Sequence, residues 1–162
     1  MKATKDTATK ELRQLIRFTV GKEEYGMDLL RVKEVIRVRQ ITWLPKAPSF
    51  VKGIINLRGE VIPIVDLREK FGLASAAETE QTRVIVVEVG GRPIGMTVDA
   101  ASQVVRIPTD QIDPPPPVLG GFSQAYITGV GRLDDELVIL LNAEAIFSAD
   151  EQNALSAIEN RN

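Results

Sequence analysis

The stretch "FVKGIINLRGEVIPIVDL" (residues 50–67) decides the fold. Two apolar runs flank Arg58-Gly59, and such an X-Gly pair is typical of a β-hairpin because glycine adopts the positive φ that a tight turn needs. Pro63 has no N–H, which indicates an edge strand or a bulge at that point. The stretch therefore predicts a hairpin with a permanent cation at its tip.

This stretch has a second copy in the chain. Shifted by 76 residues, it lies over "YITGVGRLDDELVILLNA" (residues 126–143), where Gly53 meets Gly129. A second match precedes it with a shift of 69 residues: "FTVGKEEYGMDLLRVKEVIRV" from Phe18 lies over "VEVGGRPIGMTVDAASQVVRI" from Val87. The period is too long and the copies too few for a solenoid. Two matches in the same order predict two pseudo-equivalent subdomains.

Strand periodicity dominates both copies. In "LIRFTV" (residues 15–20) successive side chains alternate between two faces, as in a β-strand. We expect an all-β fold of two pseudo-repeated five-stranded barrels, SH3- or OB-like, because closing a sheet removes its edges. About 65 residues per barrel give a marginal core, so the barrels should pack together.

The repeat also sets expected boundaries. The tail "SADEQNALSAIENRN" predicts a short helix, with Ser148 and Glu151 at the spacing of a capping box. An exchange of terminal strands between the subdomains stays open. The expected divisions are a flexible segment at 1–13, a domain at 14–147 with subdomains at 14–78 and 79–147, and a C-terminal helix at 148–162.

Composition excludes several kinds of chemistry. The chain has no cysteine and no histidine, which excludes disulfides, thiolate zinc sites and serine–histidine catalysis. No phosphate-binding, dinucleotide or metal-ligand motif is present, so we expect neither a cofactor nor a metal. The polar N-terminus does not resemble a secretory signal, and no apolar run approaches the roughly 18 residues of a membrane helix. We expect a cytoplasmic protein without direct membrane insertion.

The two copies act as an internal control, since positions filled alike serve the fold. Arg58 of the first hairpin corresponds to Asp134 of the second, so the turn is kept while the charge is reversed. Arg58 is then either an ordinary solvated turn residue or a contact for a partner. Val32 and Glu34 also differ from their counterparts. Val32 either anchors a partner or packs in the core, and core packing is slightly favoured.

Two further features allow more than one interpretation. Trp43, the only tryptophan, either covers the mouth of a barrel or sits at an interface, and covering the barrel is favoured. The proline run at 114–117 fits a polyproline ligand or a stiff surface loop, and the loop is favoured.

Several segments together resemble one family. They are "EEYGMDLLRVKEVI", "ITWLPKAPSFVKGIINLRGEVIPIVDLREKFG" and "VIVVEVGGRPIGMTVDAASQVV". Over roughly residues 14–147 the chain resembles the CheW-like family, the coupling proteins of bacterial chemotaxis. The motif G-x-x-N-L-R-G-x-x-x-P-x-x-D-L is present as Gly53, Asn56-Leu57-Arg58-Gly59, Pro63 and Asp66-Leu67. With no kinase or receiver segment, the chain is similar to the stand-alone adaptor.

The resemblance implies two five-stranded barrels joined by a third apolar core and a protein without catalytic activity. It implies an adaptor that couples the cytoplasmic tip helices of chemoreceptors to the regulatory domain of the histidine kinase CheA, at membrane receptor arrays. Receptor helices are expected in the groove between the barrels and the kinase at barrel ends. The implied receptor contacts are Val32, Gly53, Arg58 and Val104. Glu34 matches a receptor or kinase contact, and Arg83 and Gly95 match the kinase surface.

Two rival functions remain open at this stage. A small β-barrel that binds single-stranded nucleic acid is the first, although the net charge of −2 and the few aromatic residues argue against it. A hydrolase that uses two carboxylates is the second, and it requires acidic groups with strongly shifted titration. The adaptor hypothesis requires neither nucleic acid nor a small-molecule substrate.

Overall fold

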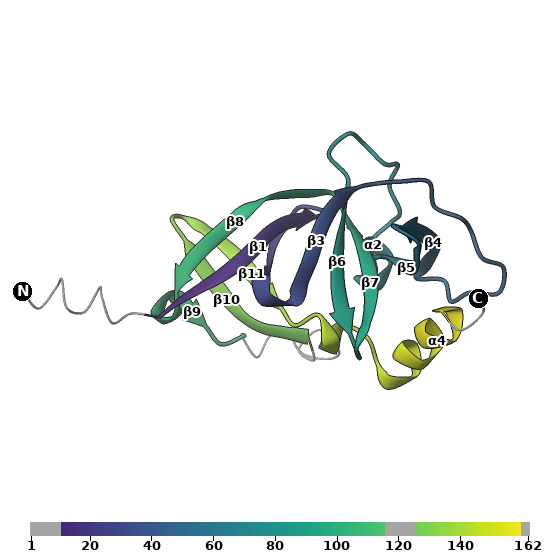
Figure 1. Cartoon of the computed structure of the whole chain (residues 1–162). Helices are drawn as coiled ribbons and strands as arrows, with labels where there is room; N and C mark the ends of the chain where they lie inside the picture. Colours follow the sequence, from purple (N-terminus) through teal and green to yellow (C-terminus); the bar gives the residue numbers. More distant parts are fainter. Residues whose placement is uncertain (1–10, 116–125, 160–162) are drawn as a thin grey trace, which may run out of the picture.

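The computed structural model describes residues 11–115 and 126–159. Figure 1 shows two β-sheets side by side, with a C-terminal helix against the five-stranded one. The strands are β1 (Leu12–Val20), β2 (Glu23–Asp28), β3 (Val32–Arg37), β4 (Val51–Leu57), β5 (Glu60–Asp66), β6 (Arg83–Val89), β7 (Arg92–Val98), β8 (Ala100–Pro108), β9 (Ile112–Asp113), β10 (Ile127–Leu133) and β11 (Glu136–Leu141). The helical elements are η1 (Leu29–Arg31), α2 (Leu67–Lys70), η2 (Thr109–Gln111), η4 (Glu144–Ile146) and α4 (Ala149–Glu159).

Each sheet contains strands from both copies of the repeat. The five-stranded sheet has the order β3-β6-β7-β5-β4, and the six-stranded sheet has the order β8-β1-β2-β11-β10-β9. The β6–β7 hairpin of the second copy thus lies between strands of the first copy. The β1–β2 hairpin makes the reciprocal insertion. The chain is therefore one interlocked unit.

The registers of the two sheets correspond residue by residue. Strands β5 and β7 are parallel with Ile64 opposite Gly95, and β11 and β2 are parallel with Leu140 opposite Gly26. Applying the two sequence shifts to the first pair gives the second pair. The bulges correspond as well: each third strand and each following hairpin shifts register at the same place. The repeat predicted from sequence is a structural repeat.

Both sheets close in the same way, by the chain that follows the third strand. After β3, Thr42 exchanges two backbone hydrogen bonds with Ile54 of β4, at 2.8 and 2.9 Å. After β8 and η2, the two-residue strand β9 pairs with β10. Because β3 and β4 are the two edges of the five-stranded sheet, the Thr42 bridge curls that sheet into a barrel. The prediction of two packed barrels and a C-terminal helix is confirmed.

Among the described residues, three apolar clusters hold the fold together. One, with Ile62 and Val86, fills the five-stranded barrel, and a second, with Leu15 and Val138, fills the six-stranded barrel. The largest, which we call the joint core, collects residues of both sheets and of α4. It is the third core that the resemblance implies. The joint core fills the space between the two barrels, which we call the seam. A partner can therefore reach only the rim of the seam.

The C-terminal helix begins with the expected capping box. The Ser148 hydroxyl accepts from the Glu151 N–H at 3.1 Å, and a Glu151 carboxylate oxygen accepts from the Ser148 N–H at 2.9 Å. Lys70 of α2 donates to both oxygens of Glu151, at 2.7 and 2.8 Å. Burial alone would raise the pKa of Glu151, but these partners hold it below its ordinary value. The helix is thereby fastened beside the five-stranded sheet.

Parts of the expected divisions lie outside the described residues. These are residues 1–10 of the N-terminal segment, 116–117 of the proline loop and 160–162 at the end of the tail.

Candidate functional site

Arg58 stands at the tip of the β4–β5 hairpin, where the backbone turns through the left-handed region. Its φ is 53°, and the following Gly59 has a φ of 88°. The side-chain oxygen of Asn56 accepts from the Gly59 N–H at 2.8 Å and fixes the turn. The Arg58 side chain is 66% exposed. The hairpin thus presents a cation to solvent from a well-defined backbone.

Arg58 forms an ion pair with Glu34 of β3. Both terminal nitrogens of the guanidinium donate to the two carboxylate oxygens of Glu34, one of them at 3.4 Å. Hydrogen bonding to Glu34 and the negative charge of Glu34 raise the pKa of Arg58. Because β3 and β4 are opposite edges of one sheet, the pair spans the closure of the barrel. It also restricts the direction in which the guanidinium points.

The two valines implied as receptor contacts lie on the edge strands of different sheets. Val32 begins β3 and is half-buried against the joint core, so core packing explains part of its apolar character. Val104 lies on β8 and is 49% exposed. Its counterpart in the first copy, Val35, is exposed as well. Each sheet therefore offers one exposed valine on its edge strand.

Both glycines among the implied contacts are buried. A Cβ at Gly53 would collide with the carbonyl oxygen of Thr42, so this glycine permits the close approach that closes the barrel. A Cβ at Gly95 would lie 2.6 Å from Ile64 Cδ1 and 2.7 Å from Val84 Cγ1, within the barrel. Any effect of these residues on partner binding would act through the backbone that they position.

Arg83 lies at the start of β6, at one end of the five-stranded barrel. Its guanidinium donates to the carbonyl oxygens of Glu80 and Thr82, at 2.7 and 2.9 Å. Its strand partner on β3 is the exposed Arg37. The structure brings Arg58 and Glu34 into contact, whereas Arg83 belongs to a separate surface.

The comparisons with known proteins agree with this geometry. The family model described as CheW-like domain matches residues 14–151. The chain is 40% identical over 134 residues to the chemotaxis protein CheW of Klebsiella aerogenes, covering 83% of this chain and 81% of the relative. It is 34% identical over 147 residues to CheW of Helicobacter pylori, covering 91% and 88%. The scaffolding protein TtCheW of Thermoanaerobacter tengcongensis superposes with a TM-score of 0.79 at 35% identity, covering 87% of this chain and 96% of that structure.

The chain belongs to the CheW family. It is a chemotaxis scaffold protein without catalytic activity, so the adaptor prediction is confirmed. None of the helices in residues 11–115 and 126–159 is long and apolar enough to cross a membrane.

The two carboxylates whose pKa values are clearly shifted, Asp99 and Glu151, do not resemble general acids. Burial of Asp99 would raise its pKa, but hydrogen bonds from the Arg68 guanidinium and the Gly21 N–H lower it below its ordinary value. The pKa of Glu151 is lowered in the same manner by Lys70. A general acid needs a raised pKa. Within the described ranges no three Asp or Glu residues converge as metal ligands.

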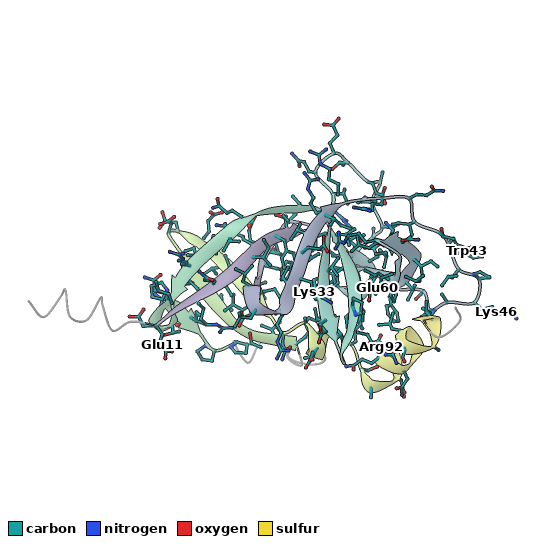
Figure 2. The ribbon with its side chains drawn as sticks, viewed as in Figure 1. Glu11, Lys33, Trp43, Lys46, Glu60 and Arg92 are labelled. Atoms are coloured by element: carbon teal, nitrogen blue, oxygen red, sulfur yellow. The ribbon has the colours of Figure 1, made fainter. Side chains whose placement is uncertain are left out.

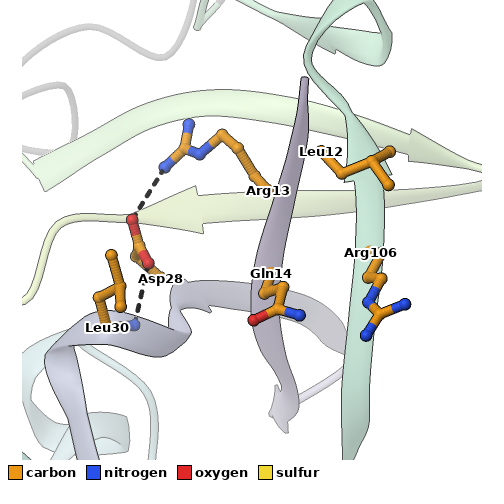
Figure 3. Close-up of a pocket in the computed structure, with 6 residues that line it drawn as sticks. All are labelled: Leu12, Arg13, Gln14, Asp28, Leu30 and Arg106. Atoms are coloured by element: carbon orange, nitrogen blue, oxygen red, sulfur yellow. Dashed lines mark hydrogen bonds and ion pairs between the residues drawn. The ribbon is translucent and has the colours of Figure 1, made fainter. Parts of the chain in front are cut away.

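Sequence reasoning missed a second exposed surface, at the outer end of the six-stranded barrel. Figure 3 shows Leu12, Leu30 and Arg106 around a shallow cavity of about 450 Å³. Leu30 is 92% exposed and Leu12 is 55% exposed. The signal was available in the repeat, because Leu30 corresponds to Asp99 in the second copy. Because the equivalent position in the second copy is acidic, the fold does not require an apolar residue at Leu30 of η1.

Trp43 does not cover a barrel mouth. It is 72% exposed, so the favoured interpretation is wrong. Its neighbours Ile41 and Leu44 occupy the inward positions instead, Ile41 against the core of the five-stranded barrel and Leu44 against the joint core.

Proposed function

We propose that this protein couples chemoreceptors to the kinase CheA through two separate surfaces. The receptor tip helices dock at the rim of the seam, with Arg58 and Glu34 as polar contacts and Val32 and Val104 as apolar ones. The CheA regulatory domain binds at the barrel ends. In this role the protein works in the cytoplasm, held at membrane receptor arrays by protein contacts.

The observation that carries the receptor assignment is the exposed, oriented guanidinium of Arg58. The equivalent hairpin tip in the other barrel has Asp134 at a φ of 54°, against 53° for Arg58. The turn therefore does not need an arginine. Two guanidinium nitrogens of Arg58 donate to Glu34. The guanidinium has five N–H groups, so further donors remain for a carboxylate or a carbonyl oxygen of a helical partner.

The exposed leucines support the kinase assignment. Leu12 and Leu30 are exposed at the end of the six-stranded barrel, and the polar margin between and beside them contains Arg106 and the Arg13–Asp28 ion pair. Exposed apolar clusters with polar margins are typical of protein interfaces. Gln14, which lines the same cavity, corresponds to Arg83 of the other barrel. The two proposed kinase surfaces are thus pseudo-equivalent ends of the two barrels.

The interlocked sheets explain how one small protein can transmit a signal between these surfaces. Each barrel contains a hairpin from the other copy, and the joint core fills the space between them. A packed core of this kind does not deform gradually. Partners bound at the rim and at the end are therefore held in a fixed relation, and a change in the receptor biases the kinase.

Replacing Arg58 tests the receptor surface. We expect Arg58→Glu to reduce binding to a purified chemoreceptor cytoplasmic fragment at least tenfold and to abolish receptor-coupled kinase activity, while binding to the CheA regulatory domain persists. Arg132→Glu is the matched control, because Arg132 is also exposed and also pairs with a carboxylate, Asp113 at 3.1 Å, but lies on the other sheet. Unchanged coupling by a folded Arg58→Glu protein would contradict the proposal.

A further inference from the structure

The segment between β3 and β4 carries an exposed aromatic residue on a firmly held backbone. We call residues 38–49 the crossing segment. It is anchored in both halves: Val38 and Ile41 pack against the core of the five-stranded barrel, and Leu44 and Ala47 pack against the joint core. The Thr42 backbone is bonded to Ile54. The segment therefore crosses from one core to the other without being free to move away.

Trp43 lies between these anchors and points outward. It is 72% exposed, and within residues 11–115 and 126–159 it is the one aromatic side chain that is largely exposed. Figure 2 shows Trp43 and Lys46 on the outer loop, both directed away from the sheets. Both neighbours of Trp43 are anchored, so its backbone is already ordered. A tryptophan presented in this way loses little conformational entropy on binding.

The charged residues within the crossing segment, Arg39 and Lys46, are both basic. Residues 35–49 contain Arg37, Arg39 and Lys46, all exposed, and no aspartate or glutamate. This window is therefore basic, although the chain as a whole has a net charge of −2. A surface that combines one aromatic residue with several cations is complementary to a partner with an apolar stripe and acidic side chains beside it. An acidic amphipathic helix has that pattern.

The crossing segment is continuous with the proposed receptor surface. Thr42 pairs with Ile54, and Arg58 follows four residues later on the same hairpin, which corresponds to roughly 13 Å along a strand. A helix rises about 5.4 Å per turn, so the same helix can meet both points with residues two to three turns apart. One partner helix is therefore long enough to contact both.

We propose that the crossing segment is a second anchor for the receptor helix that contacts Arg58. Trp43 packs on the apolar stripe of that helix, while Arg39 and Lys46 face its acidic side chains. This inference rests on the receptor-binding role proposed above. It adds two cations, Arg39 and Lys46, that favour acidic helices over neutral ones. Single-stranded nucleic acid is the weaker match, because bases need several aromatic platforms and the described part of the chain exposes only Trp43 to a large extent.

The only tryptophan of the chain supplies a direct test. We expect its emission to shift to shorter wavelength when a tryptophan-free chemoreceptor cytoplasmic fragment is added, because binding removes the indole from water. Trp43→Ala should weaken binding about tenfold or more, as expected for an aromatic anchor, and raising the salt concentration should weaken wild-type binding. Leu137→Ala is the matched control, since Leu137 is 62% exposed on the β10–β11 hairpin of the other sheet. It should bind like the wild type.

The outcomes separate this inference from the proposed function. If Arg58→Glu loses binding while Trp43→Ala binds normally and the emission stays constant, the inference is wrong and the receptor role stands. If the receptor fragment does not bind the wild-type protein at all, both fail. An emission shift caused only by oligo(dT), or only by the CheA regulatory domain, also overturns the inference. Because Trp43 is exposed, its replacement should leave the urea midpoint unchanged, so reduced binding cannot be attributed to unfolding.

Discussion

The two hairpins β4–β5 and β10–β11 have nearly the same backbone but different side chains at their tips. The residues at the turn have φ angles of 53° and 54°, and the register shift falls at the same place in both. At the tips, however, the first hairpin has Arg58 where the second has Asp134. Where Glu34 pairs with Arg58, the counterpart is Gln103. The fold therefore fixes the backbone twice, and the side chains that differ are available to bind partners.

The largest effect is expected where both barrels close. Gly53→Ala forces a Cβ into the Thr42 carbonyl, and we expect the free energy of unfolding to fall by about 3 kcal/mol. Gly129→Ala should cost less, because its Cβ would lie 2.8 Å from the Asp113 carbonyl oxygen. Urea unfolding measures both. Gly59→Ala is the control for backbone strain alone, since its φ is 88° and nothing lies within 4 Å of its Cβ position.

Equal unfolding free energies for the Gly53→Ala and Gly59→Ala proteins would show that the backbone at Thr42 can move away from the added Cβ at little cost. The comparison of the two closures would then have to be abandoned.

The next effect concerns the outer ends of the barrels. Leu30 is 92% exposed, whereas its counterpart Asp99 is bonded to Arg68 and to the Gly21 N–H. Leu30→Ser should weaken binding to the CheA regulatory domain about tenfold without changing the urea midpoint, because it removes apolar contact area only in the complex. Isothermal titration calorimetry gives the affinity. Kinase binding that is insensitive to both Leu30→Ser and Leu12→Ser would exclude this end of the barrel as the kinase surface.

How far the sequence predicts this molecule follows from the same comparison. The repeat predicts the strands and both hairpin turns, because periodicity and turn glycines are local signals. The sequence leaves open whether terminal strands are exchanged between the subdomains, because β1 and β6 have equivalent patterns and either could pair with β3. The predicted place of Trp43 is wrong because the strand pattern does not show which residue of the crossing segment faces inward. Leu30 was missed although its counterpart is charged.

The counterpart of Leu30 allows a test by pH. The pKa of Asp99 is lower in the folded protein than its ordinary value, so its stabilising effect is present above about pH 3.9 and is lost as the pH falls through the folded value. Asp99→Asn should lower the free energy of unfolding by no more than about 1 kcal/mol at pH 7, since the carboxyl side chain is 32% exposed and solvent screens the pair. The wild-type and variant curves should converge in acid. A difference that grows toward low pH would contradict the assignment.

The smallest effect on stability, and the sharpest test of the hairpin comparison, comes from Glu34→Gln, which gives the first copy the residue that stands at 103 in the second. The ion pair with Arg58 lies at the surface, so we expect an unchanged urea midpoint. The free guanidinium loses its fixed direction but keeps its charge. Receptor binding should therefore fall a few-fold, less than in Arg58→Ala, and chemoreceptor-fragment titrations of both variants measure this order. If Glu34→Gln binds more weakly than Arg58→Ala, the Glu34 carboxylate is the principal receptor contact of the pair, and Arg58 serves mainly to hold it in place.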